Sequence, residues 1–115
     1  MNTKTTFTDR AFQLWEYSVS HGSLLIRSPK TPSTSENIDL ICVGVEYLAV
    51  PRHMKGLILS EATPREIKDL SQLVGKELEA DRVRVIVSDG KRFPIVATSF
   101  RLSANLDDIF FSPFV

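Results

Sequence analysis

Residues 38–50 read Ile-Asp-Leu-Ile-Cys-Val-Gly-Val-Glu-Tyr-Leu-Ala-Val, and this stretch decides the fold class of the chain. It is the longest apolar run and is rich in residue types that favour strands. Side chains alternate between the two faces of a strand, and both faces of this run are mainly apolar. Gly44 predicts a bulge or a close backbone approach, and Pro51 ends the run because it cannot donate a ladder hydrogen bond. The run therefore predicts a central strand buried on both faces, with further strands on either side.

Shorter strands are predicted before and after this central run. They lie at residues 12–19, 24–27, 56–60, 82–88 and 95–102. A turn containing Gly22 joins the first two, and Asp89-Gly90 is a strong hairpin signal between the last two. Because short connections favour antiparallel neighbours, the first four strands are expected to form a meander.

One helix is predicted after the fourth strand. The sequence Thr-Pro-Arg-Glu at residues 63–66 combines an N-cap, a proline at the first helical position and the acid of a capping box. The apolar residues of one helical face follow, at Ile67, Leu70, Val74 and Leu78. Gly75 weakens the helix, which therefore ends there or continues to about Glu79.

The order of these elements predicts an α+β fold. We expect a mainly antiparallel sheet of about six strands, formed by a four-strand meander and a C-terminal hairpin, with the helix packed on one face. A small, partly closed β-barrel with one helix is the alternative. The length of 115 residues predicts a single domain spanning 1–115. Residues 1–10 are polar and expected to fray, and residues 28–37, with two prolines and five Ser or Thr, are expected to form a flexible loop.

Composition limits the classes of partner. The 14 basic and 14 acidic residues cancel, so attraction to nucleic acid or to an anionic membrane is not expected. Residues 1–11 lack the apolar segment of a signal peptide, and no stretch approaches the roughly 20 apolar residues that cross a bilayer. The chain is therefore expected to be soluble and cytoplasmic.

No residue spacing in the chain is specific for catalysis. Cys42, the single cysteine, lies in the apolar run, where a free thiol behaves as a small core residue. The five glycines are not clustered into a phosphate-binding loop, and His21 and His53, the only histidines, do not share a helical face. We therefore predict no catalytic residue, no metal and no cofactor, which favours a role other than that of an enzyme.

A ligand-binding rim is predicted from the topology. In a meander, the loops at 20–23 and 51–55 lie at the same end of the sheet. They would bring together four donors: His21, Arg52, His53 and Lys55. Such donors could hold a phosphate or carboxylate, and the alternative is that they are solvated loop residues.

Aromatic side chains provide candidate interaction residues. Trp15, Tyr17 and Tyr47 could meet as cross-strand neighbours, either in the core or on an exposed binding face. The last nine residues contain Phe110, Phe111 and Phe114, which in water would form a contiguous apolar patch. We expect this tail to dock on its own sheet or on a second copy of the chain.

These observations favour a non-enzymatic protein-interaction or binding module, acting as a homodimer or with a protein partner. The alternative is a small-molecule or anion-binding protein, or a small enzyme, that uses the rim of loops 20–23 and 51–55. A third alternative is an immunity- or adaptor-type bacterial protein, a class that the chain resembles only in its general form. No motif points to one family, so no residue role follows from that resemblance.

Overall fold

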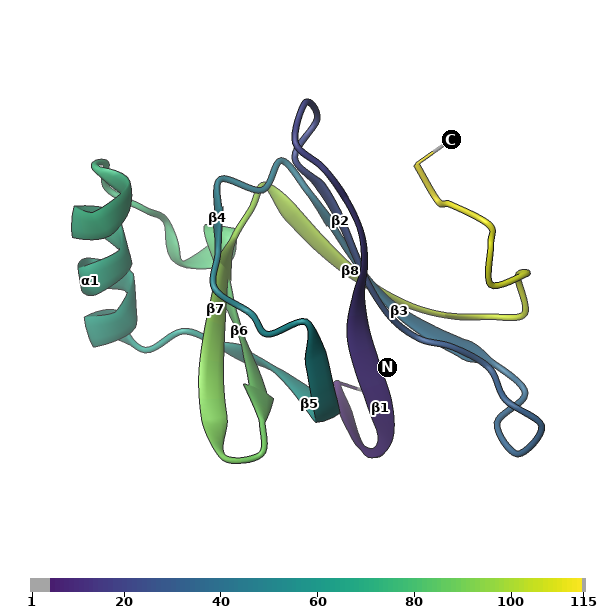
Figure 1. The fold of residues 1–115 in the computed structure, drawn as a ribbon. Coiled ribbons are helices and arrows are strands. Elements are labelled where there is room, and N and C mark those ends of the chain that lie inside the picture. The colour runs from purple at the N-terminus through teal and green to yellow at the C-terminus, as the bar shows by residue number, and fades with distance from the viewer. Residues whose placement is uncertain (1–4, 115) are drawn as a thin grey trace.

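The structure is a computed structural model that describes residues 5–114, in which one α-helix accompanies an open antiparallel sheet of eight strands (Figure 1). The elements are β1 (Thr6–Ser18), β2 (Ser23–Ser28), β3 (Asn37–Val43), β4 (Tyr47–Leu48), β5 (His53–Glu61), α1 (Pro64–Val74), a 3₁₀ turn (Ala80–Arg82), β6 (Val83–Ser88), β7 (Lys91–Val96) and β8 (Ser99–Asn105). Neighbours in the sheet follow the order β4-β7-β6-β5-β1-β2-β3-β8. The α+β prediction is confirmed, but within residues 5–114 the sheet has more strands than predicted and is not a closed barrel.

The central apolar run is divided between two strands. β3 ends at Val43, and the chain bends at Gly44, whose φ is +69°. A Cβ at Gly44 would collide with the side chain of Thr98, so glycine is required for this close approach. Beyond the bend, β4 pairs with β7, whereas β3 pairs with β2 and β8. The prediction of one strand over residues 38–50 is therefore wrong, although Gly44 does mark a close backbone approach.

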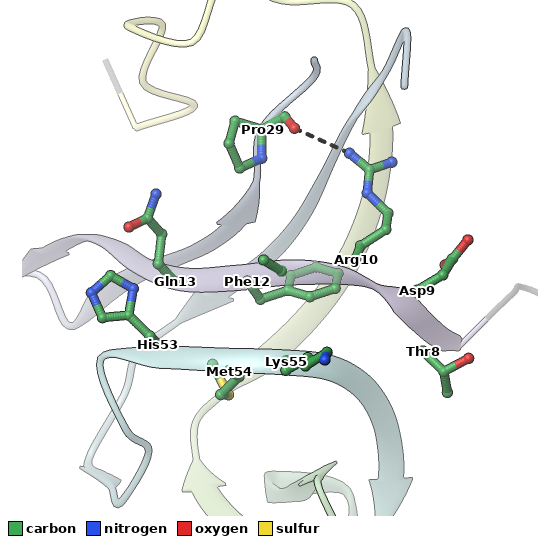
Figure 2. A pocket seen from close by; sticks show the side chains of 10 residues that line it. Thr8, Asp9, Arg10, Phe12, Gln13, Pro29, His53, Met54 and Lys55 are labelled. Atoms are coloured by element: carbon green, nitrogen blue, oxygen red, sulfur yellow. Dashed lines mark hydrogen bonds between the residues drawn. The ribbon is translucent and has the colours of Figure 1, made fainter. Parts of the chain in front are cut away.

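The predicted four-strand meander is wrong in its last step. β1, β2 and β3 are consecutive neighbours, but the next long strand, β5, pairs with β1 and β6. Figure 2 shows β5 beside β1, where Phe12 lies opposite Met54. The reason is that the chain leaving β3 does not form a tight hairpin. It bends and forms β4 first, and β5 then pairs with the edge of β1 that β2 leaves open. A C-terminal hairpin of β6 and β7 is present, but the predicted strand at residues 95–102 is wrong. The returning strand already begins at Lys91, directly after the turn, and the chain leaves it after Val96 to form β8, which pairs with β3.

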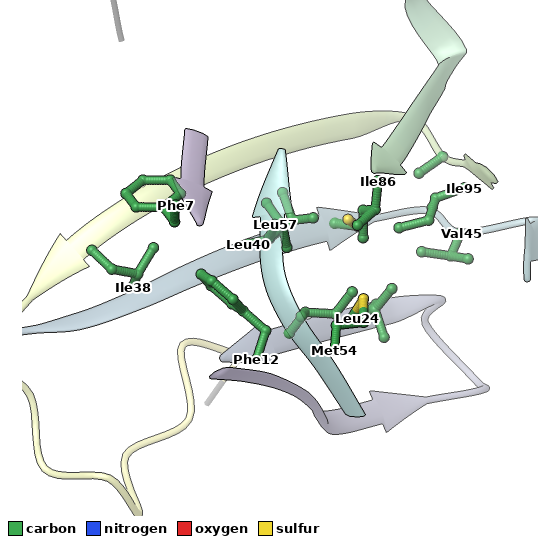
Figure 3. Close-up of a cluster of buried hydrophobic side chains, with 13 residues drawn as sticks. Phe7, Phe12, Leu24, Ile38, Leu40, Val45, Met54, Leu57, Ile86 and Ile95 are labelled. Atoms are coloured by element: carbon green, nitrogen blue, oxygen red, sulfur yellow. The ribbon is translucent and has the colours of Figure 1, made fainter. Parts of the chain in front are cut away.

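The main core lies on the inner face of the sheet, between its two halves (Figure 3). Nearly every long strand contributes to this core, with buried residues such as Phe12, Leu24, Leu40, Leu57, Ile86 and Ile95. Burying one such side chain contributes about 1.5–3 kcal/mol. The opposite face of β1, β2, β3 and β8 is called the outer face below.

Helix α1 packs against the other half of the sheet. Leu70 and Leu78 form a second buried cluster with Val83 and Val96. The predicted capping box is present, because Glu66 N donates to Thr63 Oγ1 at 3.1 Å and Thr63 N donates to Glu66 Oε1 at 2.8 Å. The helix ends at Val74, and Gly75 adopts a φ of +86° as its C-cap. Within residues 5–114, no helix is long and apolar enough to span a bilayer.

Two segments that were expected to be loose have defined contacts. β1 begins at Thr6, so residues 6–10 are strand rather than frayed, and residues 1–4 lie outside the described range. The loop between β2 and β3 is tethered by Arg10, whose Nη2 donates to the carbonyls of Ser28 at 3.1 Å and Glu36 at 2.7 Å. A bridge between Thr31 and Thr34 closes its tip.

Candidate functional site

A buried ion pair occupies the outer face. The register of β2 and β3 sets Arg27 directly opposite Asp39. Arg27 Nε donates to Asp39 Oδ1 at 2.7 Å, and Arg27 Nη2 donates to Asp39 Oδ2 at 3.0 Å. The two side chains are 0% and 2% exposed. This bidentate geometry is the strongest form of charge-assisted hydrogen bond between side chains.

Further polar groups complete this network. Asn105 Nδ2 donates to Asp39 Oδ2 at 2.9 Å, and Asn37 Nδ2 donates to Asn105 Oδ1 at 3.0 Å. The guanidinium of Arg27 also lies 5.5 Å from the ring centre of Trp15, which places a cation over an aromatic face. The hydrogen bonds that Arg27 donates to Asp39 raise the pKa of Arg27 above its ordinary value, although burial acts in the opposite direction. Arg27 therefore stays protonated although its side chain is buried.

The C-terminal tail, residues 106–114, covers this network. Arg27 Nη1 donates to the backbone carbonyl of Ile109 at 2.8 Å, and Lys30 Nζ donates to that of Leu106 at 2.9 Å. Ser112 Oγ donates to Glu16 Oε2 at 3.1 Å. Figure 1 shows the tail in yellow on the side of β1, β2 and β3 away from α1. The tail thus docks on its own sheet, mainly through polar contacts.

The phenylalanine side chains of the tail were expected to be buried, but two of them are exposed. Phe110 is 87% exposed and Phe111 is 51% exposed. Phe114 is half-buried and borders a shallow groove with Glu16 and His21. The tail is held by its backbone and by Ser112, so the rings of Phe110 and Phe111 are free to face solvent.

The ion pair of Arg27 and Asp39 is not among the features predicted above, although the sequence carries a signal for it. Asp39 is the first charged residue of a run that is otherwise strongly apolar. A carboxylate inside a buried strand needs a counter-charge, because an isolated buried charge costs several kcal/mol. Arg27, at the end of the preceding strand, was the available cation.

A second feature is a groove of about 740 Å³ that runs over the paired strands β1 and β5 and is called the β1–β5 groove below (Figure 2). Its lining residues are Thr8, Asp9, Arg10, Ala11, Phe12, Gln13, Pro29, His53, Met54 and Lys55. Gln13 lies opposite His53, and Ala11 lies opposite Lys55. Figure 2 shows the side chains of Gln13 and His53 next to each other at one end of this groove.

The structure brings together only part of the predicted rim. His53 and Lys55 line the β1–β5 groove, whereas His21 borders the groove beside the tail. The turn of His21 is tied to the end of β3, because Val45 N donates to the carbonyl of Gly22 at 2.9 Å. Ser18 lies five positions along β1 from Gln13, the residue opposite His53, which corresponds to about 16 Å of strand. The predicted convergence is wrong because β5 pairs with β1 instead of following β3.

Arg52 also stays outside the β1–β5 groove. Its carbonyl accepts from Leu14 N at 2.9 Å, and its side chain is exposed. It precedes His53, and neighbouring side chains of an extended chain point to opposite sides.

The predicted aromatic cluster is not formed. Trp15 is half-buried over Arg27, and Tyr17 is 41% exposed near the end of β1. Tyr47 lies on β4, where it packs against the cluster beneath α1. The separation follows from the pairing of β4 with β7, which takes Tyr47 away from β1.

Cys42 lies in the main core and is 0% exposed. Burial raises the pKa of its thiol to about 12. Among residues 5–114, no three His, Cys, Asp or Glu side chains gather closely enough to hold a metal ion.

Comparison of the chain with protein-family models, with curated proteins and with solved structures gave no match.

Proposed function

We propose that this chain is a non-enzymatic protein-interaction module whose contact surface is the C-terminal tail. The observation that carries this proposal is the exposure of two adjacent aromatic side chains, Phe110 at 87% and Phe111 at 51%. Large aromatics supply most of the binding energy in many protein interfaces. Adjacent exposed rings are otherwise unfavourable in water.

The anchoring of the tail supports this proposal. On either side of Phe110 and Phe111, the backbone of Ile109 is held by Arg27 and the side chain of Ser112 is held by Glu16. A segment that is already ordered loses less conformational entropy when a partner binds. The rings are thus presented on a supported backbone.

Two side chains that could serve in catalysis, Cys42 and Asp39, are inaccessible, which favours binding over catalysis. The thiol of Cys42 is buried with its pKa raised to about 12, so the reactive thiolate is scarce at neutral pH. Both oxygens of the Asp39 carboxylate accept hydrogen bonds from Arg27. Neither group is available to a substrate.

The test is the loss of association when the two rings are removed. The double variant Phe110→Ser/Phe111→Ser is compared with Leu73→Ser, which removes a side chain that is 64% exposed on α1. Sedimentation velocity over a range of concentrations detects a second copy as partner. Quantitative co-purification from the native cells detects a different protein.

We expect the double variant to lose the association and Leu73→Ser to keep it. Two outcomes contradict the proposal: a wild-type chain that associates with nothing in either measurement, or an association that both variants keep. The two readouts also separate a homodimer from a complex with another protein.

A further inference from the structure

We propose that the β1–β5 groove binds a small ligand through a phosphate or carboxylate group, with Gln13, His53 and Lys55 as its donors. This site lies on the same outer face as the tail, because Gln13 is paired with Arg27 on one side and with His53 on the other. It uses other residues than Phe110 and Phe111, so loss of anion binding and loss of protein association are separate outcomes.

The donors form a compact array. Gln13 and His53 lie directly opposite each other, and Lys55 lies two residues further along β5. Side chains in directly opposed positions have Cβ atoms about 4.5–5.5 Å apart, and alternate residues of a strand share a face. The partner of Lys55 is Ala11, whose short side chain leaves space beside the ammonium group. The array can therefore surround one oxyanion.

These donors have no partners in the described part of the chain. Across residues 5–114, the side chains of Gln13, His53 and Lys55 make no hydrogen bond or ion pair. Each keeps its hydrogen-bonding capacity for a ligand. The groove volume of about 740 Å³ falls within the range of small-molecule sites.

A bulge in β1 forms one wall of this groove. The register passes from Phe7 opposite Leu57 to Ala11 opposite Lys55, so residues 8–10 face Gly56 alone. Gly56 has a φ of +80°, and a Cβ there would lie 3.2 Å from both the Cα and the carbonyl oxygen of Thr8. Glycine thus lets the bulge pack closely on β5. Bulges of this kind are enriched beside binding sites, where they change the direction of side chains.

Arg10 fixes the bulge and adds positive charge. Its Nε donates to Ser28 Oγ at 2.9 Å, and its Nη2 donates to the carbonyls of Ser28, Pro29 and Glu36. Within residues 5–114 these partners are all neutral, so Arg10 forms no ion pair with a carboxylate.

The charges around the groove favour an anion. Arg10 and Lys55 are cationic, and Asp9 is the one carboxylate among the described lining residues. A single carboxylate is too few for a metal site, whereas several donors with an excess of positive charge suit an oxyanion.

Titration of the full chain tests this site. Inorganic phosphate and succinate serve as the two probes, each at constant ionic strength with chloride as the reference anion. Isothermal titration calorimetry gives the affinity, and amide chemical shifts give the location. We expect saturable binding of at least one probe, with shifts concentrated at residues 8–13 and 53–56. The probe that binds more tightly identifies the phosphate or the carboxylate source.

Matched variants separate a specific site from general charge attraction. Lys55→Gln should weaken binding about tenfold or more, because it removes a charge-assisted hydrogen bond. His53→Asn should weaken binding as well. Lys68→Gln removes the same charge from the exposed face of α1 and should leave the affinity within about twofold.

His53 and Lys55 are exposed, so their variants are expected to fold, and melting temperatures check this. Absence of saturable binding with both probes would falsify the site. Equal weakening by Lys55→Gln and Lys68→Gln, or shifts spread over the whole surface, would also overturn it.

Discussion

Arg27 and Asp39 are joined across β2 and β3 by two hydrogen bonds of 2.7 and 3.0 Å, and both side chains are removed from water. The third donor of Arg27 holds the carbonyl of Ile109. The ion pair therefore connects the sheet to the tail that carries the exposed Phe110 and Phe111. Stability of the outer face and presentation of the tail depend on the same guanidinium.

Breaking this ion pair on one side should strongly destabilise the protein. Arg27→Met leaves Asp39 buried without its cation, and loss of one partner of a buried pair typically costs about 3–5 kcal/mol. Urea unfolding measures the change. Arg65→Met is the matched control, because Arg65 and Asp69 form a pair whose side chains are 83% and 59% exposed. The control should stay within about 0.5 kcal/mol of wild type.

Removing both charges distinguishes the cost of an unpaired buried charge from the cost of lost side-chain packing. In the double variant Arg27→Met/Asp39→Leu no uncompensated charge remains, so we expect it to be more stable than Arg27→Met alone. A double variant no more stable than Arg27→Met would show that the cost arises from lost packing of the Arg27 side chain and not from the stranded carboxylate.

Deleting residues 109–115 should lower the melting temperature. The deletion removes the carbonyl that accepts from Arg27 Nη1 and exposes the network beneath the tail. The double variant Phe110→Ser/Phe111→Ser keeps the backbone and removes side chains that are mostly exposed, so its stability should lie within about 0.5 kcal/mol of wild type. Calorimetry measures both. A deletion that leaves the melting temperature unchanged would show that the tail contributes nothing to the fold.

Acid should weaken the start of helix α1. Hydrogen bonds from Arg92, together with that from the backbone of Thr63, lower the pKa of Glu66 to about 2. Because this folded-state pKa lies below the unfolded value of about 4.3, the ionised Glu66 stabilises the fold at higher pH, and this contribution is lost as the pH falls from about 5 to about 2.

A comparison of pH profiles isolates that contribution. The urea midpoint of wild type should fall between pH 5 and pH 2 more steeply than that of Glu66→Gln, which lacks the titrating group. Asp69→Asn, which removes an exposed acid from the same helix, should keep the wild-type steepness. Identical slopes for wild type and Glu66→Gln would contradict the role assigned to Glu66.

Cys42 should react with thiol reagents only when the protein unfolds. With a pKa of about 12, its thiolate fraction at pH 8 is on the order of one in ten thousand, and the sulfur lies in the core. Labelling with 5,5′-dithiobis(2-nitrobenzoate) should be slow in buffer and fast in concentrated urea. Fast labelling of the native chain would show that the core around β3 opens readily.

The sequence by itself determined the short-range features. Helix α1 and its capping box were predictable because Thr63, Glu66 and Gly75 act within a few residues of one another. The hairpin of β6 and β7 was predictable for the same reason, since Asp89-Gly90 sets the turn locally. The apolar character of residues 38–50 also predicted a sheet and a buried Cys42.

Only the tertiary structure decided which strands meet. The bend at Gly44 depends on contact with Thr98, which lies more than fifty residues away in the chain. That bend sends β4 to β7 and leaves β5 to pair with β1, which separates His21 from His53 and creates the β1–β5 groove. Strand pairing is a competition among distant segments with similar propensities, and it is settled by how all of them share one core. Local sequence patterns do not show which of these pairings has the lowest free energy. The sites that depend on the pairing can therefore be recognised only in the folded chain.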